Sequence, residues 1–498
     1  MKILRIISAL LPLAPICATA EITADSIYAN HMVLQQGQSI PICGNCDGTG
    51  KVTVYFNGNE VTGTVNEGRW HAVLPPMQAN AKGQPLTIMQ DGCTQVIDDV
   101  LVGEVWIASG QSNMLWRLNQ TGDTNSLREP ANANFRFYHS QPQVHTSPGA
   151  YREREKNLLN SNNMYKGGWC CNTPQTRPTM SAVGYYFGRE LQKHLGIPVA
   201  VIHASLGGSE MMAWMPPAVL DAKYPECNTE KWLDSKYMSA WVRGRARQNI
   251  GKDLNAPHPY KPAYLFRTGI APWSKFPVAG VIWYQGESDA EIQDMEQNYK
   301  LLSDLITGWR TELGKADLPF LQVELPRIND RSALRAYWPE FRTVQRRAAN
   351  EIPGVYALTT IDLGSRNSDV HPPRKLEVGT RLADLAASAV YGKNVPASGP
   401  AVSWVEPQGN SLRLHYNYAD GLKTTNGAAP NGFEISADGK TYHTATARIV
   451  GKTVVLTSPE VKKPRYARYA WQTYLEPNLV NSAGLPAVPY SSAAESRL

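Results

Sequence analysis

At 498 residues the chain is longer than one ordinary hydrophobic core supports, so two or three domains are expected. Hydrophobic residues make up 42% of the chain and charged residues 18%, fractions that are typical of a globular protein and exclude a disordered one. The net charge of +6 is small for this length and forms no basic block, which argues against a nucleic-acid partner.

Residues 1–20 have the pattern of a secretory signal peptide. Lys2 and Arg5 precede an apolar run at residues 6–16, and small residues follow as a cleavage site. The apolar run is too short to cross a bilayer and contains two prolines, so no membrane span is expected. The sequence therefore predicts an exported protein, periplasmic or extracellular, and leaves lipid attachment at Cys17 open.

Six of the seven cysteines lie beyond the signal, and export permits disulfides. Cys43 and Cys46 have the spacing of a redox or zinc motif, but they lie in a Gly-rich turn between strand-like runs. We expect a structural disulfide there, with Cys93 as a candidate partner. A second bridge is expected from the remaining cysteines, with the pairing left open: Cys170, Cys171 and Cys227.

Two regions of short strands flank the centre of the chain. In residues 21–99, strand-like runs such as 52–56 and 85–89 are separated by Asn-Gly and Asp-Gly turns, which predicts an N-terminal β-sandwich domain. The same pattern returns in residues 396–498, for example at 412–416, and predicts a C-terminal β-sandwich domain. No catalytic group of residues is visible in the N-terminal region.

Residues 100–395 alternate strands with helices and predict an α/β domain. The apolar spacing of residues 183–195 is helical, Gly and Pro then end the helix, and 199–202 reads as a strand. Repeated βα units imply a doubly wound, mostly parallel sheet. Two insertions, at about 117–178 and 217–264, are expected to shape a substrate cleft, because such long loops are usually functional. The other expected strands are 280–284, 318–323 and 355–358, and the other expected helices are 299–309, 342–350 and 376–390.

Gly110-Gln-Ser-Asn-Met114 is the first candidate for chemistry. It follows the apolar run 105–108, so its serine is expected at the strand end, where open α/β sheets bind ligands. Ser112 is a candidate nucleophile, although Ser and Asn also fill ordinary turns. A serine hydroxyl needs a base, and Asp369-Val-His371 offers a histidine with a carboxylate beside it. In an extended loop, residues two apart project to the same side, which lets Asp369 orient His371.

Two further turns offer donors for a developing oxyanion. Gly207 and Gly208 follow one predicted strand and allow close approach of backbone N–H groups, and Gln285 follows another and offers a side-chain amide. Each turn alone is also explained as an ordinary strand-to-helix connection. Together with Ser112 and His371, they place complementary parts of an acyl-transfer site at four strand ends.

Other chemistries are less well supported. Met114 stands where an α/β-hydrolase motif would have its second glycine, and His371 almost adjoins its acid. No His-Glu-x-x-His occurs among the ten histidines, and His203 is expected in the core, so neither a metal nor a cofactor is expected. Trp116 and Trp214 lie near the motifs and are candidates for stacking on a sugar ring.

These motifs resemble those of the SGNH hydrolase superfamily and, within it, of the sialate O-acetylesterases and related carbohydrate acetylesterases. Gly103–Met114 is similar to the nucleophile block, Ser205–Ser209 to the glycine block, Val281–Ser288 to the third block and Thr360–Pro372 to the histidine block. The likeness covers nearly the whole mature chain.

The resemblance implies Ser112 as nucleophile, His371 as base and then acid, and Asp369 as its orienter. The oxyanion hole that it implies is formed by the Ser112 backbone, Gly207 or Gly208, and Gln285. The residues expected near the substrate are Asn113, Trp214, Glu287 and Arg267.

The predicted function is an exported serine esterase that removes acetyl groups from carbohydrates, with O-acetyl sialate as the first substrate. Leu206 and the stretch 267–270 depart from the family pattern near the expected cleft, so an acetylesterase acting on xylan or xyloglucan is the first alternative. A non-catalytic carbohydrate-binding protein is the second. The complete set of catalytic residue types argues against it.

Overall fold

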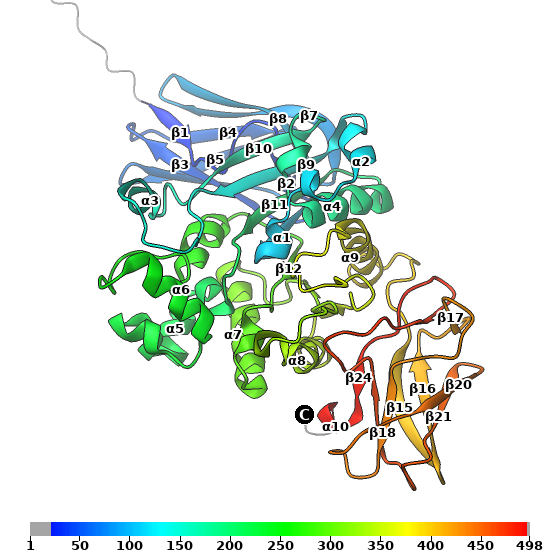
Figure 1. The fold of residues 1–498 in the computed structure, drawn as a ribbon. Coiled ribbons are helices and arrows are strands. Elements are labelled where there is room, and N and C mark those ends of the chain that lie inside the picture. The colour runs from blue at the N-terminus through cyan, green and yellow to red at the C-terminus, as the bar shows by residue number, and fades with distance from the viewer. Residues whose placement is uncertain (1–20, 496–498) are drawn as a thin grey trace, which may run out of the picture.

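The computed structural model describes residues 21–495, and these form three regions along the chain (Figure 1). The predicted signal peptide and Cys17 lie outside the described residues. Within 21–495, no helix combines the length and the apolar character that a membrane span needs. The α/β architecture with β regions at both ends, predicted from the sequence, is confirmed.

The N-terminal region is a β structure, antiparallel except for the pairing of β2 with β8, and it leads directly into the central sheet. Strand β8 (Cys93–Gly110) pairs with β7 along its first half and with the strands of the α/β region along its second half. The domain boundary predicted between residues 99 and 100 therefore falls inside one strand. The other strands are β1 (Ile22–Ala24), β2 (Val33–Gln35), β3 (Ile40–Cys46), β4 (Val52–Phe56), β5 (Asn59–Asn66), β6 (Arg69–Leu74) and β7 (Asn80–Gln90).

The central sheet has the order β10-β9-β11-β8-β12-β13-β14, and all of these strands are parallel except the edge strand β10. This confirms the doubly wound sheet. Its first two strands, β9 and β10, come from the insertion predicted at about 117–178, which therefore extends the sheet as well as adding loops. The bounds are β9 (Asn132–Pro142), β10 (Tyr165–Asn172), β11 (Val199–Ser205), β12 (Gly280–Tyr284), β13 (Phe320–Val323) and β14 (Val355–Leu358).

Helices cover both faces of this sheet, and β8 shows how the sequence fixes the faces. Val105 and Ile107 point to the side covered by α7 (Met295–Glu312) and α8 (Trp338–Glu351), whereas Trp106 and Ala108 point to the other side. There α4 (Ala182–Leu195) and α9 (Lys375–Ala389) lie side by side (Figure 1). A strand buried on both faces needs a continuous apolar run, as residues 105–108 provide. The shorter helices are α1 (Ser112–Leu115), α2 (Thr124–Arg128), α3 (Glu153–Leu158), α5 (Pro217–Lys223), α6 (Ala240–Ile250) and α10 (Ser492–Glu495).

The C-terminal region is a β-sandwich with its own core. One sheet has the order β15-β16-β21-β20 and the other β19-β18-β22-β24, and Leu414 of the first belongs to the same buried core as Ile435 of the second. A short pair, β17 and β23, completes the region. The bounds are β15 (Ala401–Gln408), β16 (Ser411–Asn417), β17 (Lys423–Thr424), β18 (Phe433–Ser436), β19 (His443–Thr444), β20 (Thr446–Val450), β21 (Thr453–Thr457), β22 (Tyr466–Tyr469), β23 (Leu479–Val480) and β24 (Tyr490–Ser491).

The disulfides expected from the sequence are not formed among the cysteines of residues 21–495. The Cys43 thiol donates a hydrogen bond to Asp25 at 3.2 Å instead, and Cys227 is hydrogen-bonded with Ser235 at 3.1 Å. Both are buried, so these thiols act as small, mostly apolar core residues.

Candidate active site

The turn after β8 brings Ser112 to the carboxyl end of the sheet. Gly110 has a φ of +134°, and a Cβ there would lie 2.1 Å from the carbonyl oxygen of Tyr284 in β12. Only glycine fits such a contact, and the next N–H, that of Gln111, donates to the same Tyr284 oxygen at 3.0 Å. The chain then turns into α1, whose first residue is Ser112.

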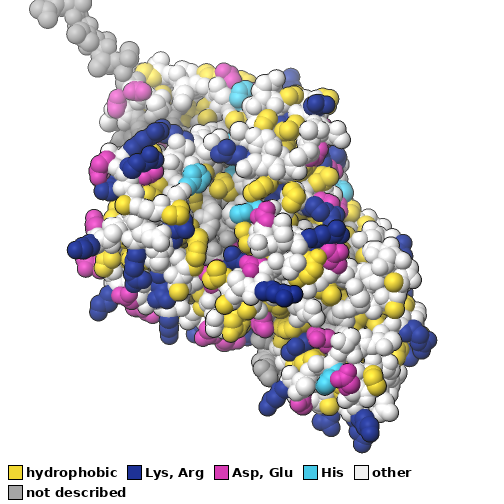
Figure 2. Space-filling model, viewed as in Figure 1, with side chains coloured by type: hydrophobic (Ala, Val, Ile, Leu, Met, Phe, Trp, Pro, Cys, Tyr) yellow, Lys and Arg dark blue, Asp and Glu magenta, His cyan; other side chains and the backbone are white. Residues whose placement is uncertain are grey.

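Ser112 lines a cavity of about 340 Å³. In the space-filling view, this region of the surface is hollowed, and charges of both signs are mixed over the face shown (Figure 2). Both insertions contribute residues to the cavity walls: His145, Thr146 and Ser147 come from the first, and Trp241 and Tyr260 from the second.

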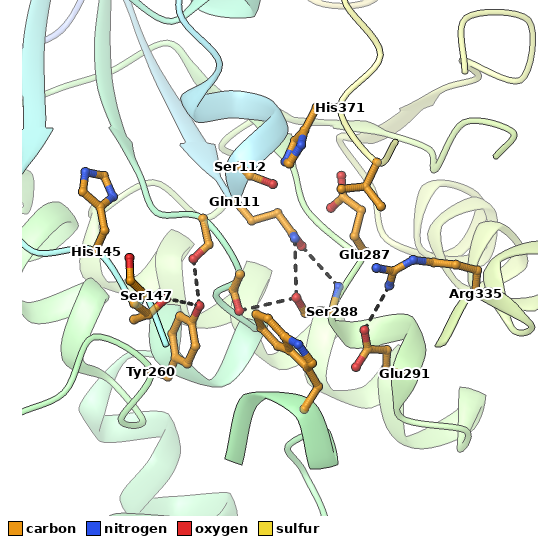
Figure 3. Close-up of a pocket in the computed structure, with 15 residues that line it drawn as sticks. Gln111, Ser112, His145, Ser147, Tyr260, Glu287, Ser288, Glu291, Arg335 and His371 are labelled. Carbon is orange, nitrogen blue, oxygen red and sulfur yellow. Dashed lines mark hydrogen bonds and ion pairs between the residues drawn. The ribbon is translucent and has the colours of Figure 1, made fainter. Parts of the chain in front are cut away.

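His371 lies over Ser112 on the loop before α9 (Figure 3). Its ring stacks on the indole of Trp116, with centroids 5.2 Å apart and planes 19° apart. The Asp369 carboxylate accepts the His371 backbone N–H at 2.9 Å and lies 3.5 Å from the ring Nδ1. The structure thus brings the predicted serine together with the predicted aspartate and histidine, which lie 257 and 259 residues after it in the sequence.

Burial lowers the pKa of the His371 imidazole below its ordinary value, and the nearby Lys375 ammonium adds to the effect. Asp369 acts in the opposite direction, but its side chain is 55% exposed, so water weakens its influence. A neutral imidazole is the form that can accept a proton.

Two glycines that follow β11 lie beside the serine at the cavity. Gly207 lies after β11, and a Cβ there would be 3.6 Å from the Ser112 Cβ. Gly208 has a φ of +72°, which turns the chain sharply at this point. Among the described residues, none accepts a hydrogen bond from the N–H of Ser112, Gly207 or Gly208. Tyr260 holds the loop in place by donating its hydroxyl to the Gly207 carbonyl at 3.0 Å.

Gln285, expected in the oxyanion hole, is placed elsewhere. It is buried behind the cavity wall, and its amide nitrogen donates to the Ser209 carbonyl at 2.7 Å and to the Asp289 carboxylate at 2.5 Å. Gln111 lines the cavity instead. Its amide oxygen accepts the N–H of Gly286 at 3.2 Å, and its amide nitrogen donates to the Ser288 hydroxyl at 3.5 Å, a long hydrogen bond that uses one of its two hydrogens (Figure 3).

Of the four residues expected near the substrate, Glu287 lines the cavity and the other three do not. Asn113 is fully buried, and its amide donates to the carboxylate of Glu287. Trp214 is also buried in the core, where its indole N–H donates to Ser209 at 2.9 Å. Arg267 is exposed on the π-helical turn Phe266–Ile270, outside the cavity lining.

A family model described as "Carbohydrate esterase, sialic acid-specific acetylesterase" matches residues 102–388, which is more than half of the chain. The chain belongs to this family. It is therefore a carboxylic ester hydrolase, and the family resemblance predicted from the sequence motifs is confirmed.

Named proteins of the same kind match over most of the chain. The sialate O-acetylesterase of Mus musculus is 26% identical over 382 residues, which cover 70% of this chain and 68% of the mouse protein. That of Pongo abelii is 26% identical over 464 residues, covering 84% and 81%. A crystal structure of a carbohydrate acetylesterase from Xanthomonas citri matches with a TM-score of 0.78 and 29% identity, covering 95% of this chain and 99% of that one.

Two charged residues that line the cavity of this acetylesterase were not predicted from the sequence motifs. Arg335 and Glu291 form an ion pair of 3.0 Å there, and burial raises the pKa of the glutamate. Neither residue belongs to a recognisable motif. The only sequence signal for Glu291 is its position in the turn that follows β12.

One group of metal-ligating side chains lies outside the cavity. His31, Asp99 and Cys171 have ligand atoms within 4.8 Å of one another. Asp99 is also ion-paired with Arg136 at 2.9 Å, and this guanidinium supplies the positive charge that a cation would otherwise bring. His203 is buried, its Nε2 bonds to Ser205 at 2.7 Å, and burial lowers its pKa to about 3.

Proposed function

We propose that this acetylesterase hydrolyses O-acetyl esters of carbohydrates with Ser112 as the nucleophile. One observation carries the proposal: Ser112 and His371 line one cavity together with Gly207 and Gly208, and no acceptor among the described residues takes the backbone N–H of Ser112 or of either glycine. A nucleophile, a base and oxyanion donors at one point are the parts that acyl transfer requires.

In the proposed reaction, His371 takes the proton of the Ser112 hydroxyl as the oxygen attacks the acetyl carbonyl carbon. The N–H groups of Ser112, Gly207 and Gly208 stabilise the resulting oxyanion. The C–O bond to the sugar breaks, the sugar oxygen takes the proton from His371, and an acetyl-serine remains. Water, deprotonated by His371, attacks that ester, and acetate leaves as the proton returns to Ser112.

Asp369 and Gln111 are assigned supporting roles. Asp369 fixes the loop through the His371 N–H and favours the imidazolium that forms during the reaction. Gln111 is assigned the side-chain donor position predicted for Gln285, because it lines the cavity and Gln285 does not. The sequence of residues 1–20 supports export of the enzyme.

O-acetyl sialate is the first proposed substrate, since the curated relatives are named for it. The cavity favours an uncharged sugar as the second candidate. Among the residues that line the cavity, Arg335 is the one with a permanent positive charge. Its guanidinium is already paired with Glu291 and, at 3.7 Å, with Asp330. A sialate carboxylate would have to compete with both. Acetylated xylan or xyloglucan carries no such carboxylate on its acetylated sugar.

The nucleophile is tested by labelling with a fluorophosphonate, followed by mass spectrometry of the peptides. We expect one modified residue, Ser112, and loss of acetate release from a small aryl acetate in proportion to the labelling. Modification of another serine with full loss of activity would contradict the assignment. Acetate release from 9-O-acetyl sialic acid, acetylated xylan and acetylated xyloglucan, compared at equal enzyme concentration, then identifies the substrate.

The pH dependence follows from the environment of His371. The imidazole must be neutral to accept the serine proton, and it becomes protonated as the pH falls through its pKa. Because burial lowers this pKa, the acid side of the kcat/KM profile is expected below the ordinary histidine value of about 6.5. The measurement uses an uncharged aryl acetate, whose own ionisation does not enter. A midpoint above 6.5 would contradict the assignment of His371 as base.

A further inference from the structure

Lys375 is a buried lysine that takes no part in the proposed steps of acetyl transfer. It is the first residue of α9, its side chain has no exposed surface, and it does not line the cavity. An ammonium group is costly to bury unless it is paired and hydrogen-bonded. Its partners are therefore informative, and they lead to the catalytic histidine by two routes.

The first route passes through the amide of Asn113, the residue after the nucleophile. Lys375 donates to the Asn113 side-chain oxygen. The Asn113 nitrogen donates to the Glu287 carboxylate and, at 2.9 Å, to the carbonyl of Val370. A cation at one end of this amide and a carboxylate at the other fix its orientation. The amide in turn fixes the peptide group that leads directly into His371.

The second route passes through Trp116. The Lys375 ammonium lies 5.9 Å from the centroid of this indole, and the same indole stacks on the His371 ring. Lys375 also lies 5.6 Å from the ring of Tyr284, in the strand that supports the turn before Ser112. The lysine thus contacts elements that hold both the serine and the histidine.

Charge links the two residues as well. The charged groups that act on His371 are Lys375, Asp369 and Arg335, and those that act on Lys375 are Glu287 and Asp369. Burial lowers the pKa of Lys375 to about 7, so the amine is protonated in the acid range where His371 titrates. Its positive charge there opposes formation of the imidazolium.

We propose that Lys375, acting through Asn113 and Trp116, is a positioning residue that holds the His371 loop over Ser112 and keeps the imidazole neutral. The inference rests on the proposed function, because it presumes that His371 is the base. It assigns Lys375 and Asn113 to the support of the catalytic histidine and not to contact with the substrate.

The test is the variant Lys375→Met in the full-length enzyme, which replaces the ammonium by an uncharged side chain of similar length. We expect kcat for an aryl acetate to fall roughly 10- to 100-fold, the cost of small misplacement of a catalytic group. KM is expected to stay the same, since Lys375 does not line the cavity. Loss of the cation is expected to move the acid side of the kcat/KM profile to higher pH. The control is Lys393→Met, at an exposed lysine just beyond α9, which should behave as the wild type.

Asn113→Ala separates the hydrogen-bonded contribution of Lys375 from the contribution of its charge. It also tests the proposal if Lys375→Met does not fold. It breaks the hydrogen-bonded route but leaves the cation, so kcat should fall while the acid side of the profile does not move to higher pH. Wild-type kcat in a folded Lys375→Met or Asn113→Ala enzyme would overturn the proposal. The proposal would also be overturned if the fall in activity of Lys375→Met matched the fall in the number of fluorophosphonate-labelled sites and the pH profile were unchanged. Failure of the wild-type enzyme to label at Ser112 would instead refute the proposed function.

Discussion

Replacing Ser112 by alanine is expected to lower kcat for acetate release by about 10⁴- to 10⁶-fold, because alanine offers no oxygen to carry the acetyl group. His371→Ala is expected to lose a comparable amount. The serine and its base act as a unit, so the removal of either one disables the attack. Acetate release from an aryl acetate, followed for hours at high enzyme concentration, measures the residual rate.

Asp369→Asn is expected to lose less than His371→Ala. The Asp369 side chain is more than half exposed and lies 3.5 Å from the ring Nδ1, so its charge is partly screened. The matched control for Ser112→Ala is Ser332→Ala, at an exposed serine outside the cavity lining, which should retain the wild-type rate. A nearly wild-type rate in His371→Ala would exclude this histidine as the base. An unaffected Ser112→Ala enzyme would move the nucleophile to another residue.

The strand ends that carry the site were predictable because each is marked by a long apolar run followed by small polar residues. Val105–Ala108 before Ser112 is such a run. The structure confirms that it is a strand and that Ser112 follows at the carboxyl end of the parallel strands. The pattern does not specify which side chain after a strand turns toward the cavity. Gln111 and Gln285 both follow strands of the same sheet, yet only Gln111 lines the cavity.

Asn113 shows a second limit of sequence reasoning. Its position next to the nucleophile suggested contact with the substrate, but its hydrogen bonds go to Glu287, Val370 and Lys375. These partners lie 174 to 262 residues away in the sequence. No local pattern contains that information, because it depends on how helix α9 packs against the turn after β8.

Strands β9 and β10 were not predicted for a related reason. Their sequences contain Asn, Gly and charged residues, which are uncommon in isolated strands. Pairing with β11 and burial of Phe135 and Phe137 against α4 stabilise β9 in spite of its composition. Tertiary contacts therefore outweigh local preference at the edge of this sheet.

Gly110→Ala is expected to lower the free energy of unfolding of the catalytic region by about 3 kcal/mol or more. Two costs add here. The φ of +134° is accessible mainly to glycine, and the new Cβ would lie 2.1 Å from a backbone oxygen that β12 holds in place. Relief of the contact requires β8 and β12 to separate, which would also displace Ser112. Thermal unfolding and the rate of fluorophosphonate labelling measure the two effects.

Gly196→Ala is the matched control for this substitution. Gly196 ends α4 with a φ of +70°, and a Cβ there would meet nothing within 4 Å, so only the conformational cost of roughly 1 kcal/mol is expected. Equal destabilisation by the two variants would show that β12 yields to the extra methyl group. A larger loss of unfolding free energy for Gly110→Ala, together with slower fluorophosphonate labelling, would instead show that the close contact with Tyr284 fixes the position of Ser112.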